Sequence, residues 1–186
     1  MNDATLALIA LGSNLPSAEG SPARTVTAAM AELSGLGRVL SRSRLWKSPA
    51  WPPGRPDYVN AAVLIETGLS PEEALGRLHA IEATFGRTRE ARWGARTLDL
   101  DLLAMGGLVR PDAETQAAWR GLDAERQGRE APDRLILPHP RMHERAFVLV
   151  PLHDVAPGWR HPLLGRTVAE MRDGLPPERL AEVAPL

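Results

Sequence analysis

Residues 58–73, YVNAAVLIETGLSPEE, decide the fold because they join a core strand directly to a helix. Residues 58–67 are rich in aliphatic and β-branched side chains, which predicts a buried strand. The next stretch, Ser70-Pro71-Glu72-Glu73, starts a helix: it has a serine cap, a proline at the first position and a glutamate at the third. Apolar residues then recur at helical spacing up to Gly86, where we expect the helix to end.

The segments on either side extend this pattern. Residues 5–11, 38–46 and 98–104 predict strands, residues 22–36 predict a helix, and the proline-rich residues 47–57 predict a loop. The order β-α-β-β-α-β is typical of a ferredoxin-like α+β fold, with two helices on one face of an antiparallel sheet. A short helix is expected at 113–119. A C-terminal extension should add a short strand and helices near 145–150 and 167–172.

Composition limits the classes of protein. The 186 residues fit one domain, 1–186, and 44% of them are hydrophobic. The formal net charge of −1 gives no bulk attraction to nucleic acid or to an anionic membrane, so neither partner is expected. The absence of cysteine excludes disulfides, thiol catalysis and zinc sites built on cysteine. The first apolar run is too short to span a membrane and follows no basic residue, so we expect no signal peptide and a cytoplasmic location.

Two acids alternate with leucines in residues 98–102, LDLDL. Side chains at positions i and i+2 of a strand share a face about 7 Å apart, so Asp99 and Asp101 should point the same way while the leucines enter the core. Neighbouring carboxylates repel each other unless a cation lies between them, and oxygen ligands favour Mg²⁺, as one ion or two. The alternation is also typical of a half-exposed strand with solvated acids.

Four arginines, Arg87, Arg89, Arg92 and Arg96, immediately precede the acidic strand. A basic loop beside a metal-binding pair suits a metal-bound polyphosphate, because guanidinium groups fork onto phosphate oxygens. Glycines before and within the loop favour a mobile lid. The alternative is a solvated loop that pairs with acids elsewhere. The chain has no G-x-x-x-x-G-K-[ST] sequence, which excludes a P-loop enzyme.

Polar residues at the edges of other elements are weaker candidates. Glu82 and His79 lie near the edge of the predicted apolar stripe, as boundary residues or as contacts. His139 could position a phosphate or a base, or could be an ordinary loop histidine. Zinc binding by His139 and His143 is disfavoured because Pro140 disrupts a helix between them.

Aromatic residues are scarce, and they belong to a core more often than to a ligand site. Asn60 shares a predicted strand face with Tyr58, so its amide could read the edge of a heterocycle.

Several strings together resemble one enzyme family. They are GSN (12–14), PDYVNAA (56–62), GRTR (86–89), RWGARTLDLD (92–101), LPHP (137–140) and RAF (145–147). They resemble 6-hydroxymethyl-7,8-dihydropterin pyrophosphokinases over roughly residues 5–160. The resemblance implies a ferredoxin-like α+β fold, two Mg²⁺ ions, a monomer with small-molecule substrates, and transfer of pyrophosphate from ATP to the pterin in folate biosynthesis, with AMP released.

The resemblance also implies roles for individual residues. Asp99 and Asp101 would hold the metals, and Arg87, Arg96 and Asp101 would assist transfer. The implied ATP contacts are His79, Glu82, Arg89, Arg92, Trp93, Leu102, Arg134, Leu135, His139 and Arg145. The implied pterin contacts are Ser48, Pro49, Ala50, Trp51, Tyr58, Asn60 and Phe147.

The chain departs from the family pattern in three places. His79 stands where some members carry glutamine, and the arginine loop is one residue shorter between Arg89 and Arg92 than in some members. The segment at about 107–133 is longer than the usual connection, and the sequence assigns it no function. Competing hypotheses are another metal-dependent nucleotidyl transferase or phosphohydrolase, an inactive paralogue, and an RNA-binding ferredoxin-like module, although paired aspartates on the sheet disfavour the last.

Overall fold

A computed structural model describes residues 4–50, 53–86 and 97–186. The strands are β1 (Thr5–Ser13), β2 (Arg38–Arg42), β3 (Trp46–Ser48), β4 (Tyr58–Thr67), β5 (Asp99–Met105) and β6 (Ala184–Pro185). The helices are α1 (Pro22–Glu32), α2 (Pro71–Thr84), α3 (Ala113–Arg120), α4 (Ala124–Arg129), α5 (Ala146–Val155), α6 (Val168–Asp173) and α7 (Pro177–Ala181), with 3₁₀ turns η1 (Leu33–Leu36) and η2 (Met142–Glu144). Within the described ranges no helix is long and apolar enough to cross a bilayer.

The strands form one antiparallel sheet in the order β5-β1-β4-β3-β6, with β2 also paired to β4. The longest pairing runs the full length of β1 against β4, from Thr5 opposite Thr67 to Ser13 opposite Val59. Together with the order of the helices, this topology confirms the α+β class and the β-α-β-β-α-β core predicted from the sequence.

The predicted strand 38–46 is divided into two short strands, β2 and β3. The division is at Ser43, whose N–H donates to Ala62 O at 2.9 Å while its Oγ accepts from Ala62 N at 2.9 Å. The Ser43 hydroxyl therefore accepts the hydrogen bond that a backbone carbonyl would accept in a continuous strand. The alternation of residue types in the sequence does not predict this interruption. Similarly, the predicted helix 22–36 changes at Leu33 into the tighter turn η1.

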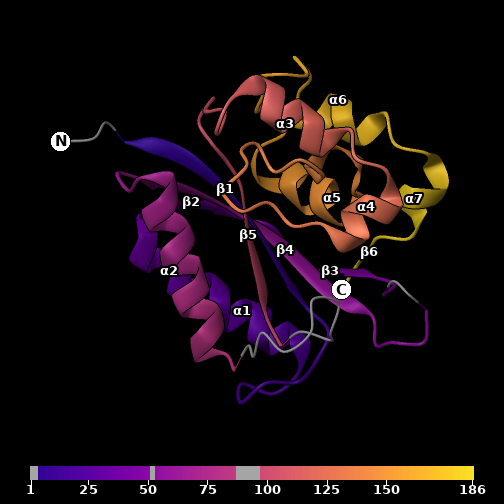
Figure 1. Cartoon of the computed structure of the whole chain (residues 1–186). Helices are drawn as coiled ribbons and strands as arrows, with labels where there is room; N and C mark the ends of the chain where they lie inside the picture. Colours follow the sequence, from indigo (N-terminus) through magenta and orange to yellow (C-terminus); the bar gives the residue numbers. More distant parts are fainter. Residues whose placement is uncertain (1–3, 51–52, 87–96) are drawn as a thin grey trace.

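Both faces of the sheet are covered by helices (Figure 1). Leu98, just before β5, and the alternate β5 residues Leu100 and Leu102 pack with α1 and α2 on one face. On the other face, Leu8 and Ala62 pack with α5 and α6. The sequence analysis assigned helices to one face only. The C-terminal extension supplies the second layer, because β1 and β4 carry buried apolar residues on both faces.

The main helix of this second layer is longer than predicted. We expected a helix near 145–150, but α5 continues through Pro151 to Val155. Proline removes one backbone donor and usually ends a helix. Here Pro151 and the neighbouring Leu152 are both buried against the sheet, and tertiary packing maintains the helix.

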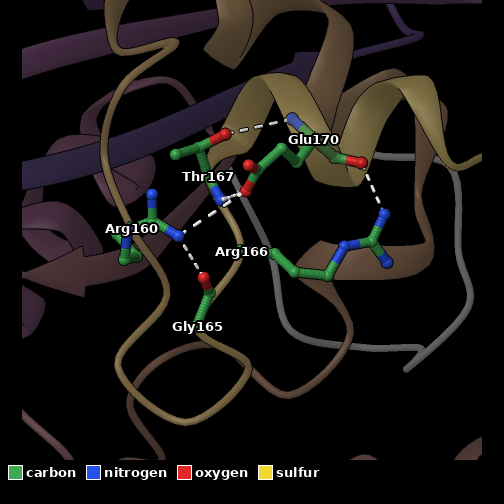
Figure 2. Close-up of polar contacts among 5 residues, drawn as sticks. All are labelled: Arg160, Gly165, Arg166, Thr167 and Glu170. Atoms are coloured by element: carbon green, nitrogen blue, oxygen red, sulfur yellow. Dashed lines mark hydrogen bonds and ion pairs between the residues drawn. The ribbon is translucent and has the colours of Figure 1, made fainter.

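Hydrogen bonds across its first turn fix the start of α6 (Figure 2). Thr167 N donates to Glu170 Oε2 at 2.7 Å, and Glu170 N donates to Thr167 Oγ1 at 3.1 Å, which completes a capping box. Arg166 donates to Glu170 O, and Arg160 donates to Gly165 O. A 3.6 Å ion pair between Arg160 and Glu170 joins the two chain segments.

Candidate active site

The two aspartates of β5 share the face of the sheet that α5 covers. The leucines at 98, 100 and 102 enter the core under α1 and α2, so the alternating residues Asp99 and Asp101 face the other way. Both aspartates are half-buried. The structure thus confirms the predicted alternation, with Asp99 and Asp101 on the same face of the strand.

A row of three residues crosses the sheet at the level of Asp99. Asp99 on β5 is opposite Gly12 on β1, and Gly12 is opposite Asn60 on β4. With strands about 4.8 Å apart, the Cα atoms of Asp99 and Asn60 are separated by about 10 Å. Gly12 carries no side chain between them. A Cβ atom added at Gly12 would lie 3.6 Å from Asn60 Oδ1 and 3.8 Å from Tyr58 Cδ1, so Gly12 leaves an open floor beside these two groups.

A hydrogen bond to the neighbouring strand orients the Asn60 amide. Asn60 and Ser48 are 4% and 5% exposed, and Asn60 Nδ2 donates to Ser48 Oγ at 2.9 Å. This bond commits the amide nitrogen to β3 and leaves the carbonyl oxygen toward Gly12. The Asn60 carbonyl oxygen is therefore a hydrogen-bond acceptor beside Gly12, where it could bind N–H groups of a heterocycle.

Strand β3, which lies beside Asn60, is connected to α5 by a side-chain hydrogen bond. Trp46 is opposite Asn60 in the β3–β4 ladder, and its indole N–H donates to Asp154 Oδ2 at 2.9 Å. Arg44 pairs with the same carboxylate at 3.5 Å, and its guanidinium carbon lies 4.8 Å from the Trp46 ring centre. The sequence analysis gave Trp46 and Asp154 no role, since residues 108 positions apart show no local signal.

An exposed aromatic ring and an arginine lie at the start of α5. Phe147 is 41% exposed, which is unusual for a large apolar residue, and the Arg145 guanidinium carbon lies 5.6 Å from its ring centre. Burial lowers the pKa of Arg145, and the negative charges of Asp101 and Asp99 counteract that effect. Arg145 remains a cation, so the residue that precedes α5 contributes positive charge near the aspartates.

His139 is neutral at physiological pH, and one of its ring nitrogens accepts a hydrogen bond from the backbone. Burial and the charge of Arg145 lower the pKa of His139 to about 3, while Asp99 acts in the opposite direction. Its Nδ1 accepts a hydrogen bond from Arg141 N at 3.1 Å. The neutral ring therefore carries its proton on Nε2, where it can donate to an anion.

Other residues expected at the ATP site lie elsewhere in the fold. Glu82 is 1% exposed, and its Oε1 accepts from Leu100 N at 2.7 Å at the outer edge of β5. Leu102 is buried with the core under α1 and α2. Arg134 is exposed and pairs with Asp133 at 3.1 Å.

The remaining predicted residues divide into three groups. His79 and Leu135 are half-buried, Pro49 is exposed, and Ala50 is 8% exposed. Tyr58 is half-buried on β4, two residues before Asn60, so the two share a face. Five residues of the arginine loop and one of the pterin loop lie outside the described residues: Arg87, Arg89, Arg92, Trp93, Arg96 and Trp51.

The end of β1 connects the loops that enclose this face. Ser13 is fully buried, and its Oγ donates to Thr97 O at 2.5 Å, next to the arginine segment. Asn14 is 1% exposed, and its Nδ2 donates to Pro56 O at 3.1 Å. Two consecutive polar residues at the end of an apolar strand are the only local signal of these contacts, because buried polar groups require bonded partners.

The aspartate pair fits a hard divalent cation. Among residues 4–50, 53–86 and 97–186, no group of three or more histidine, cysteine, aspartate or glutamate side chains is placed to hold a metal. Mg²⁺ is commonly held by one or two carboxylates together with substrate phosphates and water, so two aspartates on one face suffice. This donor set does not suit zinc, which prefers nitrogen and sulfur ligands.

The topology and the site together define the chain as a ferredoxin-like α+β domain whose sheet carries acidic, amide and aromatic groups on one face. Residues 8–157 match the model of the family described as 7,8-dihydro-6-hydroxymethylpterin-pyrophosphokinase. A Synechocystis protein named 2-amino-4-hydroxy-6-hydroxymethyldihydropteridine pyrophosphokinase is 37% identical over 96% of this chain and 80% of its own. A protein of the same name from Methylorubrum extorquens is 36% identical over 96% of this chain and 99% of its own.

Solved structures agree at the level of the fold. The wild-type Plasmodium falciparum HPPK-DHPS crystal structure with SDX-DHP matches 93% of this chain with a TM-score of 0.66 at 13% identity. This chain covers 44% of that longer chain. The family match and the curated relatives are decisive: the chain belongs to the 7,8-dihydro-6-hydroxymethylpterin-pyrophosphokinase family and is an enzyme.

Proposed function

We infer that this chain transfers the pyrophosphoryl group of ATP to 6-hydroxymethyl-7,8-dihydropterin, a step of folate biosynthesis. Family membership and the names of the curated relatives support the reaction. The row Asp99–Gly12–Asn60 is the structural observation that carries it. It gives one face of the sheet a carboxylate for the phosphate end and an amide for the heterocycle, about 10 Å apart.

The pterin end of the site is proposed around Asn60. Asn60 Oδ1 would accept from N–H groups of the heterocycle, with its Nδ2 already held by Ser48. Tyr58 and Phe147 would stack on the flat ring, and the partial exposure of Phe147 leaves its ring accessible. The Ser48, Pro49, Ala50 and Trp51 segment would line the pocket.

The phosphate end is proposed around the aspartates. Asp99 and Asp101 would hold Mg²⁺, with two ions expected, and the metal would supply neutralisation of phosphate charge. Arg145, whose charge interacts with both aspartates, would contact a phosphate oxygen. His139 would donate from Nε2 to ATP.

The arginine loop and five further residues complete the proposed ATP site. Arg87 and Arg96 would stabilise charge on the transferred group, and the segment with Arg89, Arg92 and Trp93 would close over both substrates. His79, Leu135 and Arg134 would contribute on the nucleotide side. Glu82 on α2 and Leu102 on β5 have buried side chains, so we propose for both an indirect role in which they support the strand that carries the aspartates.

The reaction balances without a covalent enzyme intermediate. The pterin hydroxymethyl oxygen attacks the β-phosphorus of ATP, and the bond from that phosphorus to the oxygen bridging the α-phosphate breaks. AMP leaves with the bridging oxygen. The hydroxyl proton passes to Asp101 or to water. Positioning and electrostatic stabilisation dominate such a transfer.

Product analysis tests this proposal. The chain is incubated with ATP, Mg²⁺ and 6-hydroxymethyl-7,8-dihydropterin, and phosphorus NMR follows the products. We expect AMP and a pterin diphosphate in equal amounts, with neither formed when the pterin is omitted. ADP with a pterin monophosphate, or AMP with free pyrophosphate, would contradict the proposal. One domain, a monomeric state and a cytoplasmic location remain predictions.

A further inference from the structure

The inserted segment after β5 contributes one buried polar side chain to the body of the fold. Helix α3 begins at the cap Asp112, which accepts from Thr115 N at 2.7 Å. Every residue of α3 is described, and only Gln116 is buried, at 0% exposure. Most glutamines are exposed, and burying an amide is costly unless its donor and acceptor are both used.

Both ends of the Gln116 amide are used. Its Nε2 donates to Pro138 O at 3.0 Å, a buried contact across 22 residues. Its Oε1 accepts from Arg120 Nη1 at 3.1 Å, one turn further along α3. The amide therefore links the insertion to the segment that precedes His139, and it has a defined orientation.

The carbonyl that Gln116 binds belongs to the peptide unit joining Pro138 to His139. The nitrogen of the same peptide unit donates to Leu103 O at 2.8 Å, on the strand that carries Asp99 and Asp101. One residue earlier, Leu137 and Arg110 exchange two backbone hydrogen bonds of 2.9 and 3.1 Å. The peptide unit between Pro138 and His139 is therefore held by two hydrogen bonds, one from the Gln116 side chain and one to the backbone of β5. Together they fix the orientation of the backbone that carries the His139 ring.

We propose that Gln116 is a positioning residue for His139, through which the insertion sets the affinity for ATP. The inference rests on the proposed function, in which His139 Nε2 donates to ATP. Without the Gln116 donor, Pro138 O is buried and unsatisfied, and the peptide unit rotates or shifts to find another partner. That movement displaces the His139 ring, while Tyr58 and Asn60 of the pterin side lie on β4 and are unaffected.

The first test compares substitutions that remove different halves of the amide. Gln116→Met keeps the volume and removes both bonds. Gln116→Glu keeps an acceptor for Arg120 but has no donor for Pro138 O at neutral pH. We expect both to raise the KM for ATP by roughly five- to tenfold, the usual effect of one buried hydrogen bond, with the KM for the pterin unchanged. Arg120→Met, which keeps the bond to Pro138, is the matched control and should keep the KM for ATP near that of the wild type.

A double-mutant cycle with His139→Ala separates this inference from the proposed function. The readouts are the KM for ATP and calorimetric binding of α,β-methylene ATP, which cannot be cleaved at the reacting bridge. We expect His139→Ala alone to weaken binding, and Gln116→Met to add nothing in that background. If His139→Ala weakens binding and Gln116→Met or Gln116→Glu does not, the positioning role is wrong. If His139→Ala has no effect, the proposed ATP contact of His139 fails and the positioning role fails with it. Additive effects would also overturn the inference.

Discussion

The two ends of the Asn60 amide have different roles at the proposed site: the nitrogen fixes the orientation of the side chain, and the oxygen is left to bind the ligand. Its amide nitrogen is held by Ser48 Oγ, and its oxygen lies beside the bare backbone of Gly12. The bond to Ser48 fixes the orientation of the amide before any ligand arrives. Preorganisation of this kind increases affinity because less conformational freedom is lost on binding.

Substitution of Asn60 should affect the pterin and spare ATP. Asn60→Leu removes the acceptor at similar volume, and we expect the KM for the pterin to rise about tenfold or more, while the KM for ATP stays near that of the wild type. Ser48→Ala keeps the acceptor and releases its orientation, so a smaller rise in the same KM is expected. Steady-state kinetics with each substrate varied in turn would check this. Equal increases in both KM values would contradict the assignment.

Glu82 joins helix α2 to the outer edge of β5, in addition to its place in the proposed ATP site. It joins α2 to β5 through Leu100 N at 2.7 Å, on the face opposite the aspartates. Glu82→Gln retains an acceptor, so the free energy of unfolding should change little. Glu82→Ala leaves a buried N–H without a partner and should lower that free energy by about 2 kcal/mol. Urea denaturation of the two variants makes the comparison, and an equal loss in both would show that the negative charge is what matters.

The elements themselves were predicted with uneven success, for physical reasons. The strand and helix of residues 58–84 carry their signals locally, in alternation and in the Ser70–Glu73 capping box, which the structure contains. The division of 38–46 at Ser43 and the extension of α5 beyond Pro151 depend on partners distant in sequence. Local propensity cannot encode such contacts, because tertiary packing overrides it.

The candidate site was predictable to a similar extent. The facing of Asp99 and Asp101 follows from a period of two, and the structure has it. The Asp99–Gly12–Asn60 row depends on the register of three strands, and the Gln116–Pro138 bond depends on how an insertion folds back. Neither leaves a trace in a single linear sequence.

The whole molecule contains a buried histidine that should make its stability depend on pH. His161 is fully buried, and its Nδ1 accepts from Leu163 N and Leu164 N, both at 3.2 Å. Burial, then the charge of Arg120 and then His143, lower the pKa of His161 from 6.5 to about 4. Below pH 6.5 the unfolded chain binds a proton that the folded chain binds only near pH 4. Stability is therefore lost as the pH falls through this window.

The expected loss from His161 is at most about 3 kcal/mol between pH 6.5 and 4, from a shift of this size. His161→Gln should reduce the slope of unfolding free energy against pH by up to one proton, whatever its effect at pH 7. His139, whose pKa is also lowered, keeps some slope in the variant. Urea unfolding at several pH values from 4 to 7.5 measures both slopes. An unchanged slope in the variant would mean that His161 titrates normally in the folded state.

At the scale of the whole molecule, one face of the sheet, under α5, is the proposed site of pyrophosphoryl transfer. The most direct test is pterin-dependent AMP release by the wild type and by Asp101→Asn, with thermal unfolding as the control for folding. We predict AMP release that requires the pterin and Mg²⁺ and that falls by roughly a hundredfold or more in the folded variant, because the aspartate helps to neutralise charge at the reacting phosphates. A folded variant that releases AMP at the wild-type rate would contradict the account and place the chemistry elsewhere on the molecule.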